Sequence, residues 1–175
     1  MLKYINKLKA SFEFGAKFAA GQIMLGECVQ LETEVRTYNV FVNEDIIQYG
    51  FFVKPSVPAC GVIMVNVSLV PLFPNIQPAY VCNNAFLALD KHMQTCIMAH
   101  EEGHIVLEHH KRKKRMFGLL DNLVRIFKEL PQEYEADKYA YQLLGDKYLD
   151  MFNFYKQFKG AKHLDSRIKA LKGDK

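Results

Sequence analysis

Two histidines and a glutamate near the middle of the chain have the types and spacing of a zinc site. The segment 100–104 reads His-Glu-Glu-Gly-His, an HExxH motif. Residues four apart in a helix lie on one face, one turn apart, so the imidazoles of His100 and His104 can bind the same metal ion. Glu101 lies beside the pair, where its carboxylate can reach a metal-bound water and act as general base. The spacing therefore predicts a hydrolytic zinc centre on a helix.

A catalytic zinc usually takes three protein ligands, and the sequence offers two candidates for the third. His110 follows His100 by ten residues, the spacing of the metzincin pattern HExxHxxGxxH. That pattern has a glycine where this chain has Leu107, and on a continuing helix His110 would point about 280° away from His100. His109 and His110 are then expected to be exposed residues in the last turns of the helix. We favour the other candidate, Glu133.

The acidic segment after Pro131 supplies this second candidate. Glu133 and Asp137 are four residues apart on the helix predicted there, so they share one face. Glu133 would bind zinc, and Asp137 would accept a hydrogen bond from the free ring nitrogen of a liganding histidine, which fixes the tautomer and the ring. Glu135 points roughly 200° away from Glu133 and is the weaker ligand on geometry. Acidic residues in a first turn also stabilise a helix through its dipole, which alone would explain Glu133. The HExxH motif upstream is the reason to interpret Glu133 as a metal ligand.

The two motifs together resemble those of the gluzincin metallopeptidases. HExxH followed by Glu-x-x-Ala-Asp, here Glu133 to Asp137, looks like the pair found in HtpX-type and CaaX-prenyl-type membrane peptidases and their soluble relatives, the minigluzincins. More distantly, the chain is similar to the ImmA/IrrE-type peptidases, which usually have Asn where Asp137 stands. The resemblance covers residues 84–171. It implies a zincin-like fold, one Zn²⁺ per chain and peptide-bond hydrolysis.

Two shorter segments carry further resemblances. Asn84-Ala85-Phe86 resembles the edge strand of that family, which pairs with the substrate backbone before the active-site helix. The segment from His163 to Arg167 resembles the family's C-terminal His-Pro…Arg-Ile segment, although no proline follows His163 and the spacing is shorter. These likenesses make His163 and Arg167 candidate donors to the transition state.

Strands are expected in the first half of the chain and helices in the second. We predict strands between 32 and 53 with a turn at 43–45, a strand over 61–70, a short strand within 79–89, and helices over 1–26, from Asp90 to near Arg115, over 119–130 and from Pro131 to before Gly145. This order indicates an α+β fold. We expect an N-terminal antiparallel or mixed sheet, with an edge strand beside the HExxH helix, followed by a helical C-terminal half.

Length and composition favour one ordinary globular domain. The chain has 175 residues, half of them hydrophobic, and a net charge of +4. A chain of this length can bury a hydrophobic core of its own. We therefore expect a single domain over 1–175, the metallopeptidase domain that the motifs predict, with an amphipathic helix at 1–26. We find no signal peptide and no apolar run long enough to span a membrane, which predicts a cytoplasmic protein. The four cysteines, scattered without a CxxC pair, favour reduced thiols, and Cys96 is expected in the core.

The sequence therefore predicts a zinc-dependent metallopeptidase that hydrolyses a protein or peptide substrate, with Glu101 as general base. A catalytically silent or latent module of the same fold, acting in interaction or regulation, is the alternative. A third hypothesis is a nucleic-acid-associated protein that uses the basic run Lys111–Arg115. A solvated helix end is the commoner explanation of such a run, and no nucleic-acid-binding fold accompanies it.

Overall fold

The computed structural model describes residues 9–10, 12–13, 25–51, 53–66, 76–111, 130–158 and 164–173. The chain divides into two compact units, Met1–Gln94 and Thr95–Lys175, and each is described by itself. The predicted helix over 1–26 lies largely outside the described residues, with helical backbone at 9–10 and 12–13. The single domain expected from the sequence stays a prediction.

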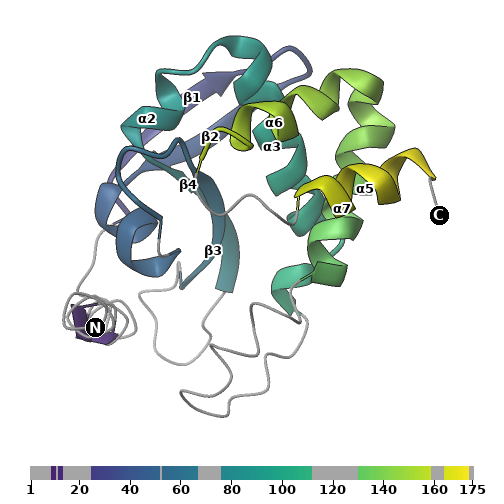
Figure 1. Ribbon diagram of the computed structural model, residues 1–175. Helices are drawn as coiled ribbons and strands as arrows, with labels where there is room; N and C mark the ends of the chain where they lie inside the picture. Colours follow the sequence, from purple (N-terminus) through teal and green to yellow (C-terminus); the bar gives the residue numbers. More distant parts are fainter. Residues whose placement is uncertain are drawn as a thin grey trace. The chain divides into compact units, whose positions relative to one another are not determined.

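The first unit contains a four-stranded mixed sheet of order β1-β2-β4-β3 (Figure 1). Its strands are β1 (Glu27–Glu32), β2 (Thr37–Val42), β3 (Cys60–Asn66) and β4 (Ile76–Cys82). β1 pairs antiparallel with β2, β2 parallel with β4, and β4 antiparallel with β3. On β2 the side chains alternate, with Tyr38 and Val40 buried and Thr37 and Asn39 exposed, as expected for a strand with one covered face.

The turn between β1 and β2 lies earlier than the sequence predicted. Thr33 closes it, because its Oγ1 accepts from the amide of Arg36 at 3.2 Å and donates to the carbonyl of Arg36 at 2.6 Å. The predicted turn at 43–45 instead leads into the π-helical segment η1 (Ile46–Gly50), so the strand expected up to residue 53 is wrong. Ile46 and Ile47 explain the difference, since both are buried in a core cluster with Val81.

Asn84, Ala85 and Phe86 do not lie on a strand, so the predicted substrate-pairing edge strand at these residues is wrong. They form α2 (Asn84–Leu87), a single helical turn that follows β4. The cause is Asn83, whose Oδ1 accepts from the amide of Phe86 at 2.9 Å and from that of Ala59 at 3.0 Å. An asparagine side chain that satisfies these amides favours a helix start over a continued ladder.

The second unit is helical. α3 (Lys91–Val106) begins in the first unit and continues into the second, with the Asp90 carboxylate capping it by accepting from the amide of Met93 at 2.7 Å. The other elements of this unit are η2 (His109–Lys111), α5 (Leu130–Leu144), η3 (Gly145–Tyr148), α6 (Leu149–Tyr155) and α7 (Leu164–Lys172) (Figure 1). The α+β fold with an N-terminal sheet and a helical C-terminal half is thus confirmed.

Two helix boundaries test the sequence analysis further. Pro131 lies in the first turn of α5 and Gly145 follows its end with a φ of 62°, as predicted. α3, however, ends at Val106 and not near Arg115, because Glu108 adopts a left-handed φ of 54° that no α-helix can contain. The predicted helix over 119–130 lies outside the described residues except for its last position. Within the parts of the chain that the structure describes, no helix is long and apolar enough to cross a bilayer.

Candidate metal centre

The metal-binding motifs meet where α3 and α5 pack closely. Gly103, inside the HExxH motif, faces Ala136: a Cβ on Gly103 would lie 3.0 Å from the Cα and 3.1 Å from the carbonyl oxygen of Ala136. Both distances are to backbone, which cannot rotate away. Glycine at 103 and a small residue at 136 therefore allow the helices to approach, and this brings the face of His100 and His104 against the face of Glu133.

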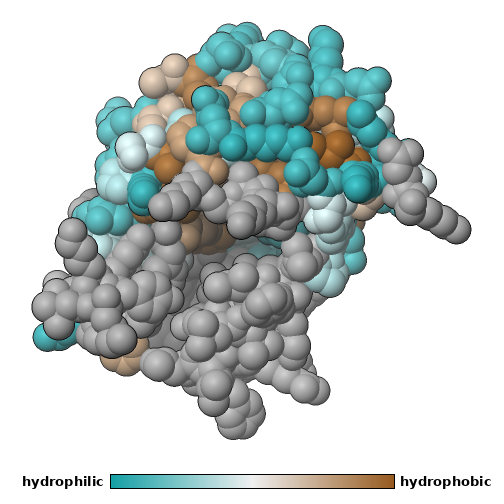
Figure 2. Space-filling model, in the orientation of Figure 1, coloured by the Kyte–Doolittle hydropathy of each residue, from teal (hydrophilic) through white to brown (hydrophobic). Residues whose placement is uncertain are grey.

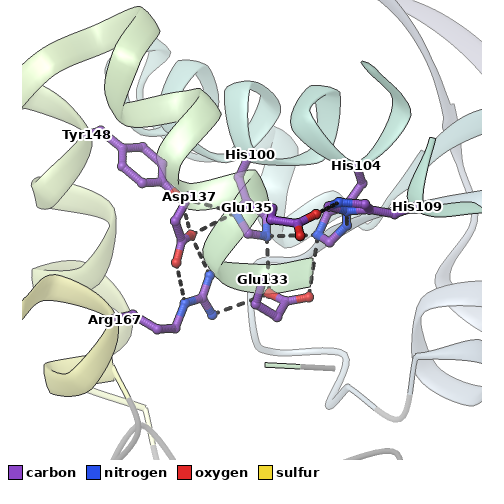
Figure 3. Close-up of polar contacts among 8 residues, drawn as sticks. All are labelled: His100, His104, His109, Glu133, Glu135, Asp137, Tyr148 and Arg167. Atoms are coloured by element: carbon purple, nitrogen blue, oxygen red, sulfur yellow. Dashed lines mark hydrogen bonds and ion pairs between the residues drawn. The ribbon is translucent and has the colours of Figure 1, made fainter. Parts of the chain in front are cut away.

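The ligand atoms of His100, His104 and Glu133 lie within 4.8 Å of one another (Figure 3). His100 Nε2 is 3.2 Å from His104 Nε2 and 3.2 Å from Glu133 Oε2, and His104 Nε2 is 3.4 Å from Glu133 Oε1. Ligands at about 2.0–2.1 Å from a tetrahedral zinc lie about 3.3–3.4 Å from each other. The spacing and the donor set, two imidazoles and one carboxylate, therefore fit a zinc ion.

The charges at this cluster attract a cation. Burial disfavours the charged form of His100, but hydrogen bonds to Asp137 and Glu133 outweigh it and raise the pKa of His100 to about 10. Burial likewise acts to raise the pKa of Glu133, yet its contacts with His100 and His104 hold that pKa well below its usual value. The cluster thus stabilises positive charge between its members, supplied by a proton or by a metal ion that replaces it.

No family model, no curated protein and no solved structure matches this chain. The resemblance to gluzincins therefore rests on the motif residues alone.

Asp137 lies behind His100, where the sequence analysis expected it. Its Oδ1 is 2.9 Å from His100 Nδ1, and the side chain is fully buried. Burial acts to raise the pKa of Asp137, but hydrogen bonds from His100 and Arg167 dominate and lower it to about 2. The carboxylate is therefore charged, and with Nδ1–H of His100 donating to it, Nε2 is left to face the metal.

Tyr148 is a member of this network that the sequence analysis missed. It is fully buried at the end of η3 and donates its hydroxyl hydrogen to Asp137 Oδ1 at 2.6 Å, while lying 3.1 Å from His100 Nδ1. Burial and the charge of Asp137 raise the pKa of Tyr148 well above its usual value, so it remains a neutral donor. No motif marks this tyrosine, because the turn after Gly145 brings it to the site.

Arg167 is buried and contacts two of the three carboxylates of α5, those of Asp137 and Glu133. Its Nε and Nη2 donate to Asp137, and Nη1 lies 3.3 Å from Glu133 Oε2 (Figure 3). The guanidinium also lies 5.3 Å from the ring centre of Phe152. Two of these donors thus hold Asp137, which lies behind His100, and the third faces the candidate ligand Glu133, so Arg167 helps to position both carboxylates. Its expected role as a transition-state donor stays a prediction. His163, the other candidate, lies outside the described residues.

Replacing Arg167 with methionine is expected to destabilise the protein by about 3–5 kcal/mol, because the buried carboxylate of Asp137 loses one of its two cationic partners, His100 and Arg167. Urea unfolding followed by circular dichroism measures the change. Lys169→Met, at an exposed position of the same helix, is the control and is expected to stay within about 0.5 kcal/mol of the unchanged protein. Equal stability of the two variants would contradict this role of Arg167.

Glu101 follows His100 directly on α3 and is partly exposed. Burial raises the pKa of Glu101 above its usual value, although the charges of His100 and His104 act in the opposite direction. A carboxylate with a raised pKa is a stronger base, which suits proton transfer near neutral pH. Cys96, one turn before His100, is buried with its thiol 3.5 Å from the carbonyl of Lys147, and it is not among the gathered ligands.

The histidines after α3 differ from expectation. His109 was expected to be exposed but is buried, because the left-handed Glu108 turns the chain back at that point. Its ring nitrogens contact His104 and Glu135. His110, the other candidate third ligand, is not in the cluster, and its Nδ1 is buried without a hydrogen-bond partner among the described residues. Of the basic run, only Lys111 is described.

A separate groove lies between α5 and α7. Its volume is about 460 Å³, and it is lined by Tyr134, Lys138, Tyr141, Gln142, Ala170 and Leu171. Figure 2 shows one face of the molecule, in the orientation of Figure 1, where hydrophobic residues (brown) lie between hydrophilic ones (teal). None of the three candidate ligands lines the groove, so it is distinct from the metal centre.

Proposed function

We propose that this protein is a zinc-dependent metallopeptidase. The observation that supports the proposal is the convergence of His100, His104 and Glu133, at spacings that match the edges of a zinc coordination tetrahedron. Glu101 follows His100 in the sequence, and burial raises the pKa of its carboxyl, although the charges of His100 and His104 oppose this. Two imidazoles, one carboxylate and an adjacent basic carboxylate form the combination used for metal-assisted hydrolysis.

When bound, zinc supplies Lewis-acid chemistry that lowers the pKa of a water molecule towards neutrality. The protein's own residues do the rest. Glu101 takes the proton of the attacking water and delivers it to the leaving amine, while Asp137 keeps the ring of His100 oriented. The proposed substrate is a peptide or protein. The cytoplasmic location stays a prediction of the sequence.

A general-base variant tests the proposal. Glu101→Gln keeps the size of the side chain but cannot accept a proton, and we expect the cleavage rate to fall at least about 100-fold with zinc content unchanged. The assay is cleavage of a library of fluorescence-quenched peptides by the zinc-loaded protein. Glu101→Asp keeps the carboxylate but shortens its reach, so its cleavage rate is expected to lie between those of the unchanged protein and of Glu101→Gln. Full cleavage by Glu101→Gln would exclude this mechanism.

A further inference from the structure

The chain returns towards His104 immediately after α3. Helix α3 ends at Val106, and Glu108 takes a φ of 54°, a left-handed conformation that is unfavourable for a residue with a side chain. This turn places the imidazole of His109 against that of His104, with ring centres 4.9 Å apart. An unfavourable backbone conformation persists only where its surroundings determine it, and here the result is a buried histidine beside a metal ligand.

His109 connects His104 to a carboxylate on α5 (Figure 3). Its Nδ1 is 2.8 Å from His104 Nδ1, and its Nε2 is 2.8 Å from Glu135 Oε2. The side chain of His109 is 3% exposed and that of Glu135 44%. The series therefore runs from a partly solvated carboxylate, through a buried imidazole, to a ligand of the candidate metal site.

The hydrogen positions along this series follow from the ligand role of His104. If His104 binds metal through Nε2, its neutral ring carries hydrogen on Nδ1. That hydrogen is donated to His109 Nδ1, which must then be the acceptor nitrogen of a neutral ring. His109 consequently carries its hydrogen on Nε2 and donates it to Glu135. Each hydrogen bond in the series thus joins one donor to one acceptor, and every ring nitrogen of His104 and His109 has a partner while both rings are neutral.

We propose that His109, held by Glu135, is a positioning residue of the metal centre that fixes the tautomer and the orientation of His104. The inference rests on the proposed function and extends it to the support of the second ligand. α5 then serves the site three times: Glu133 binds the metal, Asp137 orients His100 directly, and Glu135 orients His104 through His109. Glu135 points away from Glu133 on α5 and is therefore not a ligand candidate, but the turn at Glu108 brings His109 to it.

Metal affinity measures this role without depending on catalysis. In competition with a fluorescent zinc chelator, His109→Phe is expected to bind zinc about 10–100-fold more weakly than the unchanged protein. His110→Phe is the matched control, because the neighbouring histidine is outside the series, and its affinity is expected to be unchanged. His109→Asn places an amide near the position of Nδ1 and should recover part of the loss. His109→Gln, whose amide lies nearer the position of Nε2, should recover less.

Two further readouts separate positioning from general stability. Glu135→Gln is expected to weaken zinc binding in the unchanged protein but to add nothing in the His109→Phe background, because residues in one network are not additive. The visible absorption spectrum of the Co²⁺-loaded protein is expected to shift in His109→Phe and not in His110→Phe, since it reports ligand orientation. If His109→Phe fails to fold, His109→Asn and Glu135→Gln still supply both measurements.

The outcomes also separate this inference from the function on which it rests. Equal zinc affinity and equal Co²⁺ spectra for His109→Phe and His110→Phe, with zinc binding still lost in Glu133→Ala, would overturn the role of His109 alone. Additive losses for His109→Phe and Glu135→Gln would overturn the series. No zinc binding by the unchanged protein itself would overturn the metal site and the proposed function with it, whereas unchanged zinc affinity in Glu133→Ala would remove only Glu133 from the site.

Discussion

Replacing Glu133 with alanine is expected to leave the purified protein with little or no zinc. The substitution removes one of three ligands, so we expect the affinity to fall by more than the roughly 10–100-fold typical of residues that only support a ligand. It also removes the carboxylate that contacts both histidines and Arg167. Elemental mass spectrometry of the protein after exposure to zinc at neutral pH measures the metal content directly.

The controls for Glu133 separate metal binding from folding. Gln132→Ala, the preceding residue on α5, lies outside the cluster and is expected to keep about one zinc per chain, in line with a single three-ligand site. Glu133→Gln keeps the volume and loses the charge, so it should lose zinc while retaining the circular dichroism spectrum of the unchanged protein. Full zinc content in Glu133→Ala would remove Glu133 from the site and reopen the search for the third ligand.

Replacing Gly103 with valine is expected to lower both stability and zinc affinity, although no ligand is altered. The new Cβ would lie 3.0–3.1 Å from backbone atoms of Ala136, so the helices must separate. Forcing extra carbons into a packed contact typically costs about 1–3 kcal/mol. The gain in helix propensity over glycine, less than about 1 kcal/mol, does not offset this. Urea unfolding and zinc titration of the same samples test the two effects together.

We expect the loss of stability and zinc affinity in Gly103→Val to come from the position of the added carbon, and not from the loss of a glycine as such. Gly50→Ala is the comparison, because among the described residues its added Cβ meets the Ile46 side chain alone, at an ordinary 3.7 Å. We expect that variant to remain within about 0.5 kcal/mol of the unchanged protein. A Gly103→Val protein with unaltered stability and zinc affinity would show that close approach of α3 and α5 is not required.

The parts of the site that could be predicted from sequence depend on local spacing. Positions four apart in a helix share a face whatever surrounds them, so the pairing of His100 with His104 and of Glu133 with Asp137 needed no tertiary information. The overall α+β order followed in the same way from periodicity and from turn residues. The prediction that one helix starts near Pro131 and ends before Gly145 also rested on local chemistry.

The rest depends on contacts between distant residues. Arg167 lies 30 positions from Asp137 in sequence, and its burial follows from the docking of α7 rather than from its neighbours. The left-handed conformation of Glu108 is adopted by few residues that have a side chain, so no local signal announces it. The helix at Asn84 was missed because a single asparagine, Asn83, decides between a helix start and a continued strand through contacts with the chain near Ala59.

The order of these residues along the chain also has a consequence during synthesis. α5, with Glu133 and Asp137, leaves the ribosome before α7 brings Arg167. The 30 residues from Lys138 to Arg167 take roughly 1.5–6 s to translate, at about 5–20 residues per second. During that interval the two carboxylates lack their guanidinium partner, and burying them remains costly. The nascent polypeptide therefore carries both candidate metal-binding motifs before it can close them into one centre, and the proposed site would be complete only after translation has passed Arg167.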